Sequence, residues 1–164
     1  SEANDMNNPI VTFEMENGDS MIIELYPDEA PITVRNFKKL VSRHYYDGTV
    51  FHRVIEGFMI QGGAGAATDS IKGEFSANGV KNDLSHTRGV ISMARKGTGN
   101  NTAGSQFFIM QEDAPHLDAQ YAAFGKVTEG MEIVDKIASC KTGRYGGYSD
   151  VPREPVIITE IKHL

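Results

Sequence analysis

The residues on either side of Asn17-Gly18 alternate between apolar and polar side chains, and this alternation constrains the fold more than any other feature of the chain. Apolar side chains occupy every second position of residues 11–15 and again of residues 21–25. A period of two places them on one face of an extended strand. Asn-Gly supplies the positive φ angles that a tight hairpin turn requires. The pattern therefore predicts an antiparallel β-hairpin with one buried face.

Two other segments have helical spacing. Pro31 opens the first, and apolar residues share one face of it, which predicts a helix near residues 31–42. In the second, apolar residues recur at helical spacing between Met131 and Ala138. Short apolar runs predict further strands at residues 51–54, 58–61, 90–94 and 107–110, and a last strand at 156–161 that pairs with the first.

Strands dominate this order, with one helix early and one late. The fold class that it indicates is mainly β, a closed antiparallel barrel whose open ends are covered by the helices. A chain of 164 residues fits one domain, and no repeat, linker or composition break divides it. We expect residues 9–164 to form that domain. Residues 1–8 are expected to be disordered or a remnant of cloning.

Charge and composition exclude several classes of function. The net charge of −6, with scattered Lys and Arg, argues against a nucleic-acid surface. No apolar run approaches the roughly 20 residues of a membrane span, and the first residues lack a signal pattern, although the sequence leaves open whether a signal was removed. The single Cys140 cannot form an internal disulfide, which fits a reducing compartment. We expect a cytoplasmic protein without nucleic-acid or membrane partners.

No cofactor or metal is expected either. The five histidines include no i,i+4 pair and no Cys/His cluster of the kind that binds metals. Residues 63–68 (Gly-Ala-Gly-Ala-Ala-Thr) imitate a dinucleotide-binding loop, but Thr68 stands where the third glycine belongs. Gly73 and Gly79 also interrupt the helix that such a loop must open.

One segment has the composition of a binding site. Within residues 51–63 (Phe-His-Arg-Val-Ile-Glu-Gly-Phe-Met-Ile-Gln-Gly-Gly), Arg53 and Gln61 offer strong hydrogen bonds among apolar side chains. Residues 104–109 (Gly-Ser-Gln-Phe-Phe-Ile) repeat an amide followed by aromatics. No serine, cysteine or carboxylate stands beside a histidine as an activated nucleophile would. The pattern therefore predicts binding rather than nucleophilic attack, the plainer alternative being two ordinary core strands.

Together the two segments closely resemble the signature strands of the cyclophilin-type peptidyl-prolyl isomerases, and the resemblance covers residues 9–164. It implies an eight-stranded barrel capped by two helices, with a substrate groove on its outer wall. It also implies the function, which is catalysis of rotation about X-Pro bonds in unfolded or flexible chains, a slow step of folding. We expect a monomer that acts on proline-containing polypeptides.

The resemblance gives each motif residue a role. Arg53 matches the family arginine that donates to the proline nitrogen, and four apolar residues match the family's proline pocket. Matched amides order the arginine and the substrate backbone. The resemblance thus assigns catalysis to Arg53, Phe58, Gln61 and Phe108, and substrate binding to Met59, Gly65, Ala94, Arg95, Gln106, His116, Leu117 and Tyr121.

The chain departs from the family pattern at several positions. His116 stands where many members have tryptophan, and the chain has no tryptophan, so reduced affinity for the cyclic peptide drug cyclosporin is expected. Tyr121 replaces a frequent histidine and keeps an aromatic wall with a polar tip. The loop over residues 96–103 is longer than in shorter relatives. The loop over residues 63–73 is shorter than in many, which weakens the assignment of Gly65.

Two other functions stay open at this point. A binding module or holdase would keep the groove but lose the arginine, so the presence of Arg53 argues against it. An unrelated β-barrel carrier of a small ligand would need an internal cavity lined by small residues. The bulky Phe, Ile and Met side chains on the predicted strands argue against that cavity.

Overall fold

The computed structural model describes residues 8–164, so the prediction for the N-terminal segment falls almost wholly outside the described residues. Strands β1 (Ile10–Met15) and β2 (Ser20–Leu25) form the predicted hairpin, with Phe13 opposite Met21. Gly18 takes a φ of 95° in the turn, a conformation that glycine adopts without steric cost. The alternate apolar side chains of both strands are buried as predicted.

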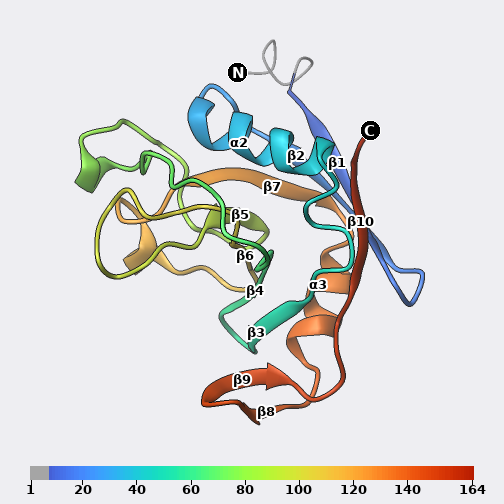
Figure 1. Cartoon of the computed structure of the whole chain (residues 1–164). Helices are drawn as coiled ribbons and strands as arrows, with labels where there is room; N and C mark the ends of the chain where they lie inside the picture. The colour runs from blue at the N-terminus through green and yellow to red at the C-terminus, as the bar shows by residue number, and fades with distance from the viewer. Residues whose placement is uncertain (1–7) are drawn as a thin grey trace.

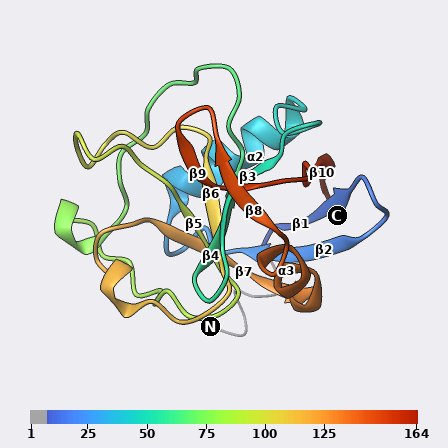
Figure 2. The ribbon, with the colours of Figure 1, turned by 90° about the horizontal axis from the view of Figure 1, so that it is seen from below.

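Eight antiparallel strands form one strongly curled sheet in the order β10-β1-β2-β7-β5-β6-β4-β3 (Figures 1 and 2). The last strand pairs with the first along its length, as predicted, with Phe13 opposite Ile161. The other sheet strands are β3 (Phe51–Ile55), β4 (Met59–Gly62), β5 (Val90–Met93), β6 (Phe107–Met110), β7 (Ala123–Glu129) and β10 (Ile158–His163).

The predicted closed barrel is wrong in one respect, because the sheet is an open one. Among the described residues, no ladder joins its edge strands β3 and β10. The two ends meet at the isolated bridge between Val50 and Ile157, where Phe51 N donates to Val156 O at 3.0 Å. The register shift between Phe51 and Arg53 supplies a physical reason, since a bulge bends a strand and ends its pairing.

Both predicted helices are present, α2 at Pro31–Ser42 and α3 at Met131–Ala138. Helix α2 packs against β10, whereas α3 packs against β2, β3 and β4 (Figure 1). The ring of Phe37 on α2 enters the core, 5.8 Å from Phe107 and 5.2 Å from Phe124 between ring centroids. Aromatic rings therefore fill the space between this helix and the curled sheet.

Two strand regions were missed. Strand β7 carries Gly125 in its middle, which breaks the apolar pattern, yet a Cβ there would lie 2.5 Å from Glu24 O on β2. Strands β8 (Thr142–Tyr145) and β9 (Tyr148–Pro152) form a hairpin in a region where no strand was predicted. Two short 3₁₀ turns, η1 (Ser76–Asn78) and η2 (Pro115–Leu117), complete the fold.

Within residues 8–164, no helix is long and apolar enough to cross a membrane.

Candidate active site

Neighbouring residues on β4 and β6 belong to two separate apolar clusters. Phe107 and Ile60 belong to the core inside the curled sheet, whereas Phe108 and Met59 belong to a second cluster on the other face. Successive side chains of a strand point to opposite faces, so each strand builds both clusters at once. The second cluster forms the apolar wall of the predicted site and places it on the outside of the sheet.

A hollow of about 170 Å³ opens on this outer face. Its lining combines five apolar side chains with two guanidinium groups, one amide and one tyrosine. Nine of the predicted site residues line it, namely Arg53, Phe58, Met59, Gln61, Ala94, Arg95, Phe108, Leu117 and Tyr121. The structure therefore brings together residues from β3, β4 and β6, the β3–β4 turn, η2, and the segments directly after β5 and before β7.

Hydrogen bonds link three polar side chains in a row, and two of these side chains, Arg53 and Gln61, line the hollow. Arg53 Nη1 donates to Gln61 Oε1 at 3.4 Å, and Gln61 Nε2 donates to Gln106 Oε1 at 3.0 Å. Arg53 and Gln61 are direct partners in the β3–β4 ladder, which fixes their spacing. Arg53 is exposed and has no ion pair among the described residues. Its remaining N–H groups are free to donate to a guest.

Arg95 also lines the hollow. Its guanidinium lies 4.9 Å from the centroid of the Tyr121 ring and 5.4 Å from that of Phe75, and its Nε donates to Gln120 O at 2.9 Å. Ala94 N donates to Gln106 O at 3.0 Å. That amide is already used, so a peptide that pairs with Ala94 meets its carbonyl group rather than its N–H.

Gly65 and Gln106 lie outside this hollow. They line an adjoining hollow of about 370 Å³ that shares Gln61, Ala94 and Arg95 with the first. A Cβ at Gly65 would lie 2.9 Å from the hydroxyl of Tyr45, which itself donates to Ala66 O. The glycine thus lets the loop pass close to the tyrosine.

His116 also lies outside the lining of the first hollow. Its ring stacks on the ring of Phe58, with 5.9 Å between centroids and 27° between planes. Phe58 lines the hollow and His116 does not. His116 is exposed, so the structure places it on the surface next to Phe58.

In the folded chain a serine and a carboxylate do lie beside a histidine, in a buried arrangement. His86 Nδ1 lies 2.9 Å from Asp118 Oδ1, and His86 Nε2 lies 2.9 Å from Ser92 Oγ. These residues are far apart in sequence, so local spacing could not reveal the contact. Ser92 is 0% exposed and His86 is 1% exposed, so no substrate reaches the hydroxyl. The predicted lack of nucleophilic chemistry is therefore unaffected.

One group of side chains has the spacing of metal ligands. The ligand atoms of His44, Asp47 and Glu160 lie within 4.8 Å of one another on the surface. They belong to the chain after α2 and to β10, so sequence spacing did not reveal them. His44 Nδ1 hydrogen-bonds Asp47 Oδ2 at 3.1 Å. None of the three lines either hollow of the candidate site.

Comparison with known proteins gives a consistent result. The profile of the family described as "Cyclophilin type peptidyl-prolyl cis-trans isomerase/CLD" matches residues 10–163. A peptidyl-prolyl cis-trans isomerase of Acinetobacter baylyi is 47% identical over 150 residues, covering 85% of this chain and 78% of the relative. Peptidyl-prolyl cis-trans isomerase B of Escherichia coli is 41% identical over 167 residues, covering 93% and 98%.

Solved structures agree with the sequence relatives. A cyclophilin-type isomerase of Cryptosporidium parvum superposes with a TM-score of 0.84 at 31% identity, covering 96% of this chain and 98% of that one. A second structure of it, in the presence of the dipeptide Ala-Pro, gives a TM-score of 0.82 at 30% identity, covering 94% and 98%.

Proposed function

The chain belongs to the cyclophilin-type peptidyl-prolyl cis-trans isomerases and catalyses rotation about X-Pro bonds; from this premise we propose that the hollow beside Arg53 is its active site. The observation that carries the proposal is the position of Arg53, which brings N–H donors beside the apolar side chains that line the hollow. Such a site fits a proline ring, which is apolar and has no donor, next to a peptide bond that must be polarised.

The chemistry of rotation explains why an arginine is needed there. Amide resonance sets a barrier of roughly 18–20 kcal/mol. As the bond twists, the nitrogen lone pair is no longer shared with the carbonyl and becomes a hydrogen-bond acceptor. A donor from Arg53 to this nitrogen gains strength only near the transition state, so it raises kcat rather than merely tightening binding. The step transfers no proton and needs no cofactor.

The other residues of the site position the two reactants. Phe58, Met59, Phe108 and Leu117 enclose the proline ring, while the carbonyl of the preceding residue swings. Gln61 orients the guanidinium of Arg53 and is itself held by Gln106. The neighbouring hollow, which includes Gly65, receives residues of the substrate that precede the proline. The relative studied in the presence of Ala-Pro supports a proline-containing guest.

Further properties are part of the same proposal. Residues 9–164 act as one domain and as a monomer, and the lone Cys140 favours the cytoplasm. Proline-containing chains are the substrates. Cyclosporin binds more weakly than to relatives with tryptophan, because His116 offers less apolar area and no indole N–H.

Titration with a short peptide that contains Ala-Pro tests the location of the site. In NMR spectra of the labelled protein, the amide signals of residues 53–61 and 106–108 are expected to shift, and exchange between the cis and trans peptide signals is expected to accelerate. Signals of residues 16–19, which form the β1–β2 turn and line neither hollow, serve as the internal control. Accelerated exchange with shifts confined to that turn would place the active site elsewhere.

A further inference from the structure

His86 lies behind the proposed proline site and contacts two of its walls. Its ring stacks on that of Phe108, with 6.0 Å between centroids and 19° between planes, and it meets the ring of Tyr121 edge-on at 6.5 Å. Phe108 and Tyr121 also touch each other, at 5.7 Å. His86 is 1% exposed and does not line the hollow, so it acts on a substrate only through these rings.

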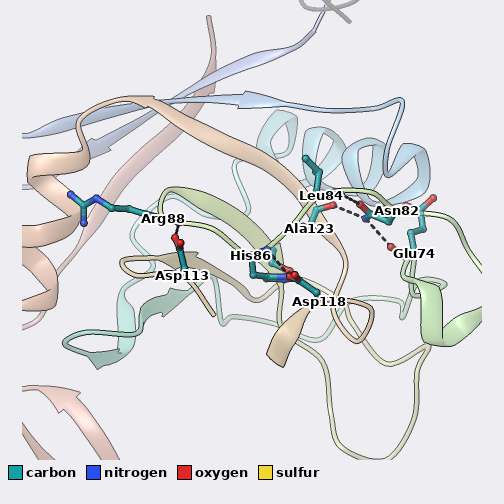
Figure 3. A network of polar contacts seen from close by, with 9 residues as sticks. Glu74, Asn82, Leu84, His86, Arg88, Asp113, Asp118 and Ala123 are labelled. Atoms are coloured by element: carbon teal, nitrogen blue, oxygen red, sulfur yellow. Dashed lines mark hydrogen bonds and ion pairs between the residues drawn. The ribbon is translucent and has the colours of Figure 1, made fainter. Parts of the chain in front are cut away.

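His86 also fixes the 3₁₀ turn η2, which carries Leu117, a third residue that lines the hollow. His86 N donates to Asp118 Oδ1 at 2.6 Å, and its Nδ1 meets the same oxygen at 2.9 Å (Figure 3). Ala114 N donates to His86 O at 2.8 Å. Ala114 and Asp118 flank η2, which carries Leu117, so three hydrogen bonds to one residue hold both ends of that turn.

The hydrogen bonds also fix the orientation and tautomer of the ring. A carboxylate only accepts, so Nδ1 carries the hydrogen that is donated to Asp118. In the neutral ring, Nε2 then accepts from the hydroxyl of Ser92, 2.9 Å away on β5. Ser92 is the direct partner of Phe108 in the β5–β6 ladder. The imidazole is thus held at both nitrogens, with one face toward Phe108.

We propose that His86 is a positioning residue of the isomerase, which sets the width of the proline hollow by fixing the ring of Phe108 and the turn that carries Leu117. The inference rests on the proposed function of the hollow. It goes beyond that function because it assigns a role to a buried side chain that touches no substrate.

The charge state of His86 gives this role a measurable signature. Burial lowers the pKa of His86, and the charge of nearby His116 adds to this effect, while the hydrogen bond and the charge of Asp118 oppose it. Tyr121 faces the ring edge, and the guanidinium of Arg95 lies over Tyr121. Protonation turns Nε2 into a donor, so the hydroxyl of Ser92 loses its acceptor. The network must then rearrange beneath Phe108.

The first test replaces His86 by a residue that has an aromatic ring but no ring nitrogen. His86→Phe keeps a flat ring but removes both side-chain hydrogen bonds, and kcat/KM at pH 7.5 is expected to fall on the order of tenfold. Ile161→Val, a buried change on β10, controls for lost stability and is expected to leave kcat/KM unchanged. The NMR signals of the Phe108 ring are expected to broaden or split in His86→Phe alone. Unchanged kcat/KM and an unchanged Phe108 ring would overturn the proposal.

The pH profile supplies a second test that does not depend on His86→Phe folding. In the unmodified protein, kcat/KM is expected to fall only at pH values well below about 6.5, the ordinary value for histidine, because burial lowers the pKa of His86. Asp118→Asn keeps an acceptor but removes the charge that favours protonation, so this acid limb is expected to move to lower pH. An acid limb that stays in place, or none before the protein unfolds, would contradict the role of His86. Loss of the proposed function itself would appear separately, as full activity in Arg53→Ala.

Discussion

Arg53 and Gln61 face each other across the β3–β4 ladder, and Arg53 Nη1 lies 3.4 Å from Gln61 Oε1. This is a long hydrogen bond to a neutral amide, so it orients the guanidinium without neutralising its charge. Gln106 holds the other end of Gln61 at 3.0 Å. The arginine is thus directed by amides, whereas a carboxylate would compete with the substrate for its donors.

Gln61→Leu is expected to lower kcat/KM about tenfold, mainly through kcat, because the guanidinium loses its orientation but keeps its charge. Steady-state measurement of the Gln61→Leu variant with an Ala-Pro peptide checks this. Gln120→Leu, an amide outside the hollow, is the matched control. An effect on KM alone would show that Gln61 binds substrate rather than orienting the arginine.

The turn that carries Phe58 is held from outside the site. Gly57 N donates to Gln111 Oε1 at 2.6 Å, and Gln111 Nε2 donates to Asp135 Oδ1 at 3.3 Å. Arg88 donates to both oxygens of Asp135, at 2.7 and 2.6 Å. Gln111→Leu is therefore expected to raise KM a few-fold and to lower the free energy of unfolding by about 1 kcal/mol. Kinetics and urea unfolding measure the two effects, and an unchanged KM would show that Phe58 keeps its place without Gln111.

Only part of the fold behind these predictions could be foreseen from the sequence. The hairpin around Gly18 and both helices could be predicted because period, turn and proline signals are local. Strand β7 could not, since Gly125 is required by its close approach to Glu24 O, a contact between distant segments. The open edge of the sheet depends on the bulge after Phe51, which leaves no sequence signal.

The candidate site, like the fold, could be predicted from the sequence only in part. The resemblance singled out Arg53, Phe58 and Phe108, which the structure brings to one hollow. His86 was missed because its partners Ser92 and Asp118 meet it only in the folded chain. The sequence shows only a histidine a few residues before the predicted strand at 90–94, which does not say what the ring contacts.

Stability is expected to fall as the pH drops below about 6.5. Burial lowers the pKa of His86 and of His52 in the folded protein, with Arg53 adding to the effect at His52. The unfolded chain therefore binds more protons in this range, so acid favours unfolding. Urea unfolding at pH 7.5, 6.5 and 5.5 measures the slope. His86→Phe is expected to reduce it, and an equal slope in the variant would assign the effect to other groups.

Between about pH 6.5 and 9, turnover is expected to be nearly flat, because bond rotation transfers no proton and arginine stays protonated throughout. The initial rate of cis–trans exchange at saturating and at limiting peptide, measured across this range, gives both kcat and kcat/KM. A bell-shaped profile centred near neutrality would indicate acid–base catalysis instead.

His116→Trp is expected to tighten cyclosporin binding by about 1–3 kcal/mol, since the indole adds apolar area and an N–H donor. Turnover is expected to change little, because His116 stacks on Phe58 but does not line the hollow. Calorimetric titration of both proteins measures the affinity. Equal, tight binding before and after the substitution would show that this position does not govern the drug.

Arg53→Ala tests the central claim most directly. The account predicts that kcat/KM falls at least about 100-fold, roughly 2.7 kcal/mol of transition-state stabilisation, while the fold persists because the side chain is exposed. Arg35→Ala, which removes an exposed arginine from α2, is the matched control and should retain full activity. Near-normal turnover in a pure, folded Arg53→Ala protein would contradict the assigned mechanism.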